Sequence, residues 1–151
     1  MDLGKQYERI YKYLYYHLHD RHEAEDLTQE AFLRFLTSRT YRDENRQLHY
    51  LYTIARNLCR QRFRDKAITY TLNEEVVDRG EEGFEQALMQ RICLREALEK
   101  LSAQEREILF LRYINEVPVS VLSRLYHISR FAVYRKLNGI LKKLKIEMEE
   151  I

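Results

Sequence analysis

Apolar side chains recur along most of the chain at the three- and four-residue spacing of an amphipathic helix. One proline, Pro118, and four glycines in 151 residues leave few positions that would interrupt helices. The pattern predicts helices at residues 3–18, 21–37, 46–65, 84–100, 103–114, 118–126 and 129–148. Asp20, Ser102 and Ser129 each precede one of them as candidate N-caps, and Glu105 completes a capping box with Ser102. We expect an all-α protein.

The stretch 67–83 departs from this pattern. Residues 68–72 alternate like a strand, but the sequence offers no second strand with which they could pair. Gly80 and Gly83 follow among acidic residues. We interpret this stretch as an extended acidic linker. It would join two small helical domains, residues 1–66 and residues 84–151.

Charge is distributed unevenly along the chain, although the net charge is only +2. Residues 56–66 carry five Lys or Arg against one acid, and residues 129–145 carry six against none. Residues 74–85 carry six acids against one arginine. Two basic segments joined by an acidic one indicate a protein that binds a polyanion at two points.

Several functional classes are disfavoured by the composition. No apolar run approaches the ~20 residues of a membrane span, and the first residues lack a secretory pattern, so we expect a cytoplasmic protein without membrane insertion. Cys59 and Cys93 form no C-x-x-C pair and are interpreted as buried apolar side chains. His17, His19 and His22 do not share one helical face. We therefore expect no metal site, no cofactor and no catalytic site.

Residues 118–145 have the pattern of a helix-turn-helix. Leu122 and Leu125 would face inward on the first helix, residues 126–128 would form the turn, and an apolar stripe on the second helix comprises Val133, Leu137, Ile140 and Leu144. The residues predicted to contact duplex DNA are Ser129, Arg130, Phe131, Arg135, Asn138 and Lys142. Phe131 could touch a thymine methyl group or pack against the preceding helix. A plain helical hairpin is the alternative, which the excess of basic residues disfavours.

The helix at 21–37 would bury Ala24, Leu27, Ala31 and Phe35. Its other side presents Asp26, Gln29, Glu30 and Leu33. A leucine within an acidic patch is typical of a surface that docks a basic partner. A merely solvated acidic face remains the alternative.

The helix at 46–65 also has two distinct faces. It would bury Leu48, Leu51, Tyr52, Ala55, Leu58 and Cys59. Its other face gathers the residues predicted to bind single-stranded DNA: Tyr50, Thr53, Arg56, Asn57, Arg60 and Arg64. This chemistry suits that ligand because bases stack on aromatic rings, amides read base edges and arginines hold phosphates.

Three segments carry a family resemblance. Residues 24–32, Ala-Glu-Asp-Leu-Thr-Gln-Glu-Ala-Phe, resemble sigma region 2.2. Residues 50–57, Tyr-Leu-Tyr-Thr-Ile-Ala-Arg-Asn, resemble regions 2.3 to 2.4 of the extracytoplasmic-function group. Residues 98–113, followed by the helix-turn-helix, are similar to sigma region 4. Their order and spacing resemble a compact sigma-70 family factor over nearly the whole chain.

The resemblance implies a non-enzymatic protein that binds core RNA polymerase and directs promoter recognition, promoter melting and transcription initiation. Region 2 would bind the polymerase clamp and the melted −10 element, and region 4 would bind the flap and the duplex −35 element. Asp26, Gln29 and Glu30 match the polymerase-contacting positions, and the loop Thr37–Gln47 matches the one that pockets a flipped −10 base. An anti-sigma factor is a further candidate partner.

The chain departs from the family pattern at several positions. Tyr50 stands where the family usually has tryptophan, and His127 replaces the turn glycine and must therefore tolerate an unusual backbone angle. Residues 121–123 are Val-Leu-Ser instead of Glu-Ile-Ala, while Phe131, Ala132 and Tyr134 replace a small residue, Thr and Lys. These departures bear on the −35 sequence more than on the role.

The alternative function is a stand-alone helix-turn-helix transcriptional regulator. It would account for residues 118–145. It would leave unexplained the acidic face at residues 26–30 and the second basic helix around residues 56–66.

Overall fold

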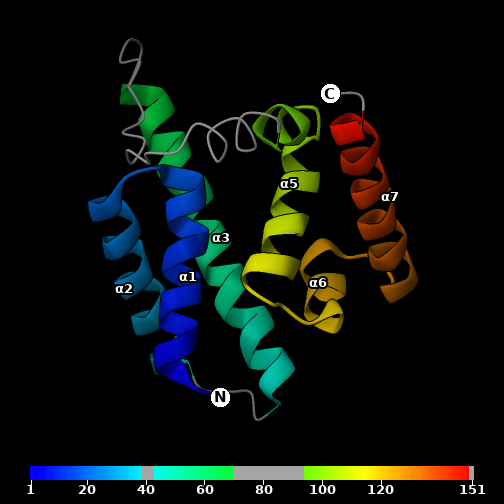
Figure 1. Cartoon of the computed structure of the whole chain (residues 1–151). Helices are drawn as coiled ribbons and strands as arrows, with labels where there is room; N and C mark the ends of the chain where they lie inside the picture. The colour runs from blue at the N-terminus through cyan, green and yellow to red at the C-terminus, as the bar shows by residue number, and fades with distance from the viewer. Residues whose placement is uncertain (39–42, 70–93, 150–151) are drawn as a thin grey trace. The chain divides into compact units, whose positions relative to one another are not determined.

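The computed structural model describes the backbone of residues 1–38, 43–69 and 94–149, and the side chains of residues 1–38, 43–65 and 94–146. These ranges contain helices and no strand (Figure 1), which confirms the all-α prediction. The helices are α1 (Leu3–Leu18), α2 (Arg21–Thr37), α3 (Glu44–Thr69), α5 (Ala103–Leu109), η1 (Phe110–Ile114), α6 (Val119–Tyr126) and α7 (Arg130–Glu149). An amino-terminal unit contains α1, α2 and α3, and a carboxy-terminal unit contains α5, η1, most of α6, and α7.

The first two helices of the amino-terminal unit begin at aspartate caps. The Asp2 carboxylate accepts a hydrogen bond from the Lys5 backbone N–H at 3.1 Å. The Asp20 carboxylate, as predicted, accepts from the His22 and Glu23 backbone N–H groups at 2.9 and 3.1 Å. These bonds satisfy N–H groups that the helix itself leaves without a partner. Between the helices, His19 turns the chain with a φ of 55°.

Aromatic and aliphatic side chains fill the space among α1, α2 and α3. Tyr13 and Tyr52 are buried and meet edge to face, with ring centroids 5.8 Å apart. The predicted inward residues of α2 are buried, and so are Thr28 and Phe32. The Thr28 hydroxyl is satisfied inside the core because it donates to the Ala24 carbonyl. This packing fixes α2 against its neighbours and leaves its opposite side to solvent.

Helix α3 is longer than its apolar pattern predicted. It begins at Glu44 because Asp43 supports the first turn: its carboxylate accepts from the Asn45 backbone N–H at 2.9 Å, and its carbonyl accepts from the Gln47 backbone N–H at 2.9 Å. The predicted loop Thr37–Gln47 is therefore wrong at both ends, since Thr37 is the last residue of α2 and residues 44–47 are helical. Residues 39–42 lie outside the described ranges.

The predicted boundary between the first domain and the linker at residues 66/67 also differs from the observed helix. Helix α3 continues to Thr69. The alternating pattern suggested an extended segment from residue 67. Adding a residue to an existing helix costs little, and the helical hydrogen bonding continues through these residues instead. The rest of the predicted linker, residues 70–83, lies outside the described ranges, as do Cys93 and the first part of the predicted helix 84–100. Residues 94–99 are helical, and Cys59 is buried as expected.

The predicted helix at 103–114 is present, with a change of helix type near its end. Ser102 and Glu105 form the predicted capping box, with bonds of 3.1 and 3.0 Å. From Phe110 the backbone takes the wider π-helical turn, and the Asn115 N–H bonds to the Phe110 carbonyl at 3.1 Å. Periodicity alone did not predict this widening.

The helix-turn-helix is formed as predicted, with its turn shifted by one residue. Tyr126 is the last residue of α6, and the turn runs over residues 127–129. His127 has a φ of 57°, which confirms that it bears the unusual angle where the family has glycine. The Ser123 hydroxyl donates to the Ile128 carbonyl, and the Ser129 hydroxyl caps α7 by accepting from the Ala132 N–H at 3.1 Å. Side chains thus fix the angle at which α7 leaves the turn.

The apolar stripe of α7 faces the core of the carboxy-terminal unit. Val133, Leu137 and Ile140 are buried, and Leu144 is half-buried. This burial fixes the rotation of α7 about its axis and exposes the side that carries the predicted DNA contacts. Among the described helices, none is long and apolar enough to cross a membrane.

Candidate functional site

The side of α2 opposite the core forms one continuous exposed surface. We call Asp26, Gln29, Glu30 and Leu33 the α2 face. Asp26 and Gln29 are exposed, Glu30 is half-buried, and Leu33 exposes 61% of its surface. Leu36 of the same helix is also exposed, at 39%, so Leu33 is the most exposed apolar side chain of α2 and lies beside two carboxylates.

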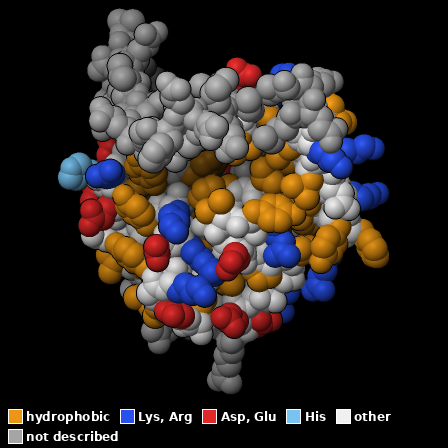
Figure 2. All heavy atoms as spheres, in the orientation of Figure 1, with side chains coloured by type: hydrophobic (Ala, Val, Ile, Leu, Met, Phe, Trp, Pro, Cys, Tyr) orange, Lys and Arg blue, Asp and Glu red, His pale blue; other side chains and the backbone are white. Residues whose placement is uncertain are grey.

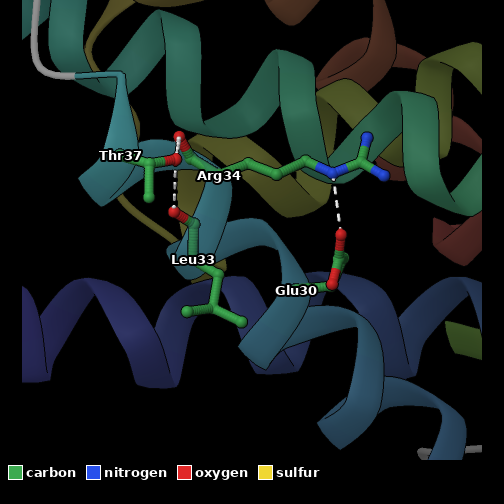
Figure 3. Close-up of polar contacts among 4 residues, drawn as sticks. All are labelled: Glu30, Leu33, Arg34 and Thr37. Atoms are coloured by element: carbon green, nitrogen blue, oxygen red, sulfur yellow. Dashed lines mark hydrogen bonds and ion pairs between the residues drawn. The ribbon is translucent and has the colours of Figure 1, made fainter.

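Short-range contacts hold the end of α2 in place (Figure 3). The Arg34 guanidinium reaches Glu30 at 2.9 Å. The Thr37 hydroxyl donates to the Leu33 and Arg34 carbonyls at 2.9 and 3.1 Å. The Leu33 side chain points away from the Arg34–Glu30 pair in this view. Carbonyl groups in the last turn of α2 therefore accept hydrogen bonds without any contribution from the Leu33 side chain.

The α2 face borders a groove of about 310 Å³ between α2 and α3. Its lining residues are Asp26, Leu27, Glu30, Arg34, Leu58, Gln61, Arg62 and Asp65. Three carboxylates and two guanidiniums therefore surround it. Arg62 also bridges to Glu23 of α2 at 3.6 Å, which ties the two helices together.

The groove includes residues that sequence reasoning did not assign. Asp65 and Arg62 lie on α3, 29 or more positions from the α2 face in the sequence. Asp65 is the single acid within the basic run 56–66, and this exception in the sequence could have indicated that it has a different role. Arg62 was not among the predicted DNA contacts, and in the structure it pairs with an acid of the neighbouring helix.

The α3 face contains the residues predicted to contact single-stranded DNA: Tyr50, Thr53, Arg56, Asn57, Arg60 and Arg64. Asn57, Arg60 and Arg64 are exposed, and the other three are half-buried. The Tyr50 ring lies 6.2 Å from that of Phe35, and the Thr53 hydroxyl donates to the His49 carbonyl at 2.7 Å. Tyr50 and Thr53 are thus partly held within the unit, while the exposed amide and arginines project from it.

The α7 face comprises Ser129, Arg130, Phe131, Arg135, Asn138 and Lys142. All six are exposed. Phe131 exposes 82% of its surface, so the expectation that it might pack against the preceding helix is wrong. Figure 2 shows basic side chains in blue and hydrophobic ones in orange together along the edge that α7 occupies in Figure 1.

Lys143 belongs to the same basic run but has a different contact. Its ammonium lies 2.9 Å from the Glu105 carboxylate and so joins α7 to the start of α5. The pKa of Glu105 is lowered, first by the hydrogen bond from the Ser102 backbone N–H and then by Lys143. Lys143 therefore stabilises the unit, and the charge of Lys142 one position earlier is carried on an exposed side chain.

Two family descriptions match the chain in the order in which the units occur. Sigma-70 region 2 matches residues 5–68, which include α1, α2 and nearly all of α3. Sigma-70 region 4 matches residues 91–144, which include the helix-turn-helix.

Among the described residues, no group of three His, Cys, Asp or Glu side chains is placed to hold a metal ion.

Curated relatives share the same class. The chain is 29% identical over 161 residues to the ECF RNA polymerase sigma factor SigW of Bacillus subtilis, covering 88% of this chain and 85% of the relative. It is 29% identical over 133 residues to the ECF RNA polymerase sigma factor BldN of Streptomyces coelicolor, covering 80% of this chain and 50% of the relative. It is 25% identical over 154 residues to the ECF RNA polymerase sigma factor SigX of Bacillus subtilis, covering 95% and 79%. The chain therefore belongs to the sigma-70 family and is an RNA polymerase sigma factor of the ECF type.

Proposed function

We propose that the two units divide promoter recognition between them while the α2 face holds the protein on core RNA polymerase. The observation that carries this proposal is the chemistry of the amino-terminal unit. Within that one unit, an acidic, leucine-bearing α2 face and a basic, amide-bearing α3 face project from different helices. The first suits a basic protein surface and the second suits nucleic acid.

The polymerase contact of this proposal is the α2 face with the adjoining groove. Glu30→Lys together with Asp26→Lys should abolish holoenzyme formation, because two attractive carboxylates become two repulsive ammonium groups. Loss of the Glu30–Arg34 pair should cost only about 0.3–0.5 kcal/mol of folding stability, since both side chains are largely exposed. Glu25→Lys is the matched control, because Glu25 is exposed on the same helix and does not line the groove.

The −10 contact of this proposal is the α3 face. Asn57 would read base edges of the melted strand, and Arg60 and Arg64 would hold its phosphates. The exposed state of all three side chains leaves their polar groups available. The segment between α2 and α3 would receive a flipped base.

The −35 contact of this proposal is the α7 face. Arg135 and Asn138 would approach base edges in the major groove, while Arg130 and Lys142 would contact phosphates. Ser129 would contribute its hydroxyl hydrogen to a phosphate while its oxygen caps the helix. The burial of Val133 and Leu137 on the other side supports this orientation.

The proposed activity is binding alone, without a catalytic centre or cofactor in this chain. It is carried out in the cytoplasm, where core polymerase and promoter DNA are found. An anti-sigma factor would be the natural antagonist, because any protein that covers the α2 face competes with polymerase. We expect such a partner to be basic where it meets Asp26 and Glu30.

The decisive experiment compares the intact chain with and without core polymerase. Alone, it should bind promoter duplex weakly and with strong salt dependence, because each small basic face makes few base contacts and most of its attraction is to phosphates. With core polymerase, permanganate footprinting should show strand opening and run-off assays should show a transcript. Tight, sequence-specific duplex binding by the chain alone, with no initiation when polymerase is added, would favour the stand-alone regulator.

A further inference from the structure

The start of α7 carries two exposed aromatic rings, of which Phe131 belongs to the α7 face and Tyr134 has no role proposed above. Phe131 exposes 82% of its surface and Tyr134 exposes 52%. Most other rings of the described chain are buried or half-buried, and burial of a phenylalanine ring ordinarily favours folding by ~1.5–3 kcal/mol. Phe131 does not contribute this burial energy to the fold, which indicates that its ring contacts a ligand.

The two side chains project from neighbouring positions on the exposed side of α7. They are three residues apart, and helical residues at this spacing have Cβ atoms about 5–6 Å apart. At 100° per residue, Tyr134 lies within about 60° of Phe131, and Asn138 within about 20°. Val133 and Ile140 point to the opposite side and are buried. Phe131 is also the second residue of the helix, and the first residues of a recognition helix are those that reach base edges.

The charge around the rings selects the class of ligand. The sequence has no acidic residue between Glu116 and Glu147, whereas Arg130, Arg135 and Lys142 add exposed positive charge to the same helix. A polyanion suits such a surface, whereas an apolar protein groove would have to desolvate all of these cations. Within duplex DNA, the apolar group that the major groove presents is the C5-methyl of thymine.

We propose that Phe131 and Tyr134 form an aromatic pair that contacts thymine methyl groups in the −35 duplex and gives this sigma factor a thymine preference there. The proposal rests on the proposed −35 role of α7. Neighbouring bases of one strand are 3.4 Å apart along the axis, so two rings that extend from Cβ atoms about 5–6 Å apart can reach two neighbouring base pairs. Phe131, with no hydroxyl, takes one methyl, and the partly exposed Tyr134 ring takes the adjoining one.

The test uses holoenzyme assembled from the full chain and core polymerase. A promoter pool randomised over the −35 region gives the selected site, and each thymine in it is then replaced singly by deoxyuridine. This replacement removes only the methyl group and leaves base pairing unchanged. For the wild-type chain, deoxyuridine at one or two adjacent positions should weaken binding about threefold to fivefold.

The variants separate the aromatic contact from general DNA binding. Phe131→Ala should bind the thymine and deoxyuridine probes equally at one position, and Tyr134→Ala should do so at the neighbouring position. Leu141→Ala, an exposed apolar change further along α7, should keep full discrimination, and Lys142→Ala should weaken both probes alike. Because Phe131 and Tyr134 are exposed, circular dichroism should show unchanged folding.

Two outcomes would overturn this inference while leaving the sigma function intact. One is a wild-type holoenzyme that is indifferent to deoxyuridine at every selected position. The other is a Phe131→Ala variant that keeps the discrimination or loses affinity for core polymerase, which would make the ring a packing or protein contact. Failure to form holoenzyme or to select any −35 sequence would instead count against the proposed function.

Discussion

His127 occupies a backbone conformation that side chains other than glycine disfavour. Its φ is 57°, at the turn between α6 and α7, and its side chain is exposed. A side chain in the left-handed region costs roughly 1–2 kcal/mol, and histidine is among the residues that tolerate it best, so we take the lower end. Glycine would remove this cost but lose about 0.5–1 kcal/mol more backbone entropy on folding. We therefore expect His127→Gly to stabilise the carboxy-terminal unit by at most about 0.5 kcal/mol.

The assay is thermal unfolding of the full chain, followed by circular dichroism. A stabilisation of about 0.5 kcal/mol would raise the midpoint by about 2–4 °C for a unit of roughly 60–100 residues, which is therefore the largest shift expected. Hydrogen exchange of the α6 and α7 amides assigns the change to the correct unit, because slower exchange should be confined to those helices. His19→Gly is the companion change, since His19 has a φ of 55° after α1. It should slow exchange in the amino-terminal unit instead.

His127→Ala distinguishes the backbone from the side chain. Alanine keeps the Cβ atom that causes the steric cost, so this variant should be no more stable than the wild type. A stability of His127→Gly equal to or below that of His127→Ala would refute the reasoning. It would mean that the imidazole contributes more to the turn than its exposure indicates.

Five further substitutions test DNA binding and stability. Lys142→Ala should weaken duplex binding evenly across sequences and reduce the slope of log affinity against log salt concentration by about one, and a change of sequence preference would contradict its phosphate role. Lys143→Ala should mainly lower stability, because Lys143 pairs with Glu105. Asn57→Ala should cost about 1–3 kcal/mol and relax preference at one −10 position in competition assays, and an unchanged preference would remove it from the reading set. Glu105→Gln should destabilise the fold at pH 7, because the lowered pKa of Glu105 means that the folded state favours the charged carboxylate. The loss of stability should shrink as the pH falls below the ordinary pKa of 4.5 and vanish below the folded pKa, and a loss that grew in acid would show that the folded state does not lower this pKa. Gly139→Ala should raise stability by about 1 kcal/mol in urea unfolding, since no atom lies within 4 Å of the added Cβ, and a lower midpoint would reveal a hidden clash.

The sequence predicted the helices because their signals are local. The Ser102–Glu105 capping box, the Asp20 cap and the stripe of Val133, Leu137 and Ile140 depend on neighbours within a turn or two. Caps and stripes of this kind follow from backbone geometry and can be identified without knowing what packs against what. The positive φ of His127 was expected from the resemblance, because the family has glycine at this turn.

Helix ends and types were less well predicted. The start of α3 at Glu44 depends on hydrogen bonds to Asp43, and the π-helical turn from Phe110 depends on a bond from Asn115. Both involve single hydrogen bonds that apolar periodicity does not reveal. Differences of a few residues at helix ends are therefore expected even where the helix itself is correctly identified.

Only the tertiary structure decided how individual charged and aromatic side chains are used. From the sequence alone, Arg62 and Lys143 are equivalent to the other basic residues around them, yet one pairs with Glu23 and the other with Glu105. The sequence left open whether Phe131 packs inside or is exposed. Burial of the apolar stripe sets the rotation of α7 about its axis and leaves the ring exposed. The sequence determined the family, the helices and the general location of the faces, because local pattern and charge suffice for these. The partner of each side chain depends on residues distant in sequence that packing brings together, and this only the folded chain establishes.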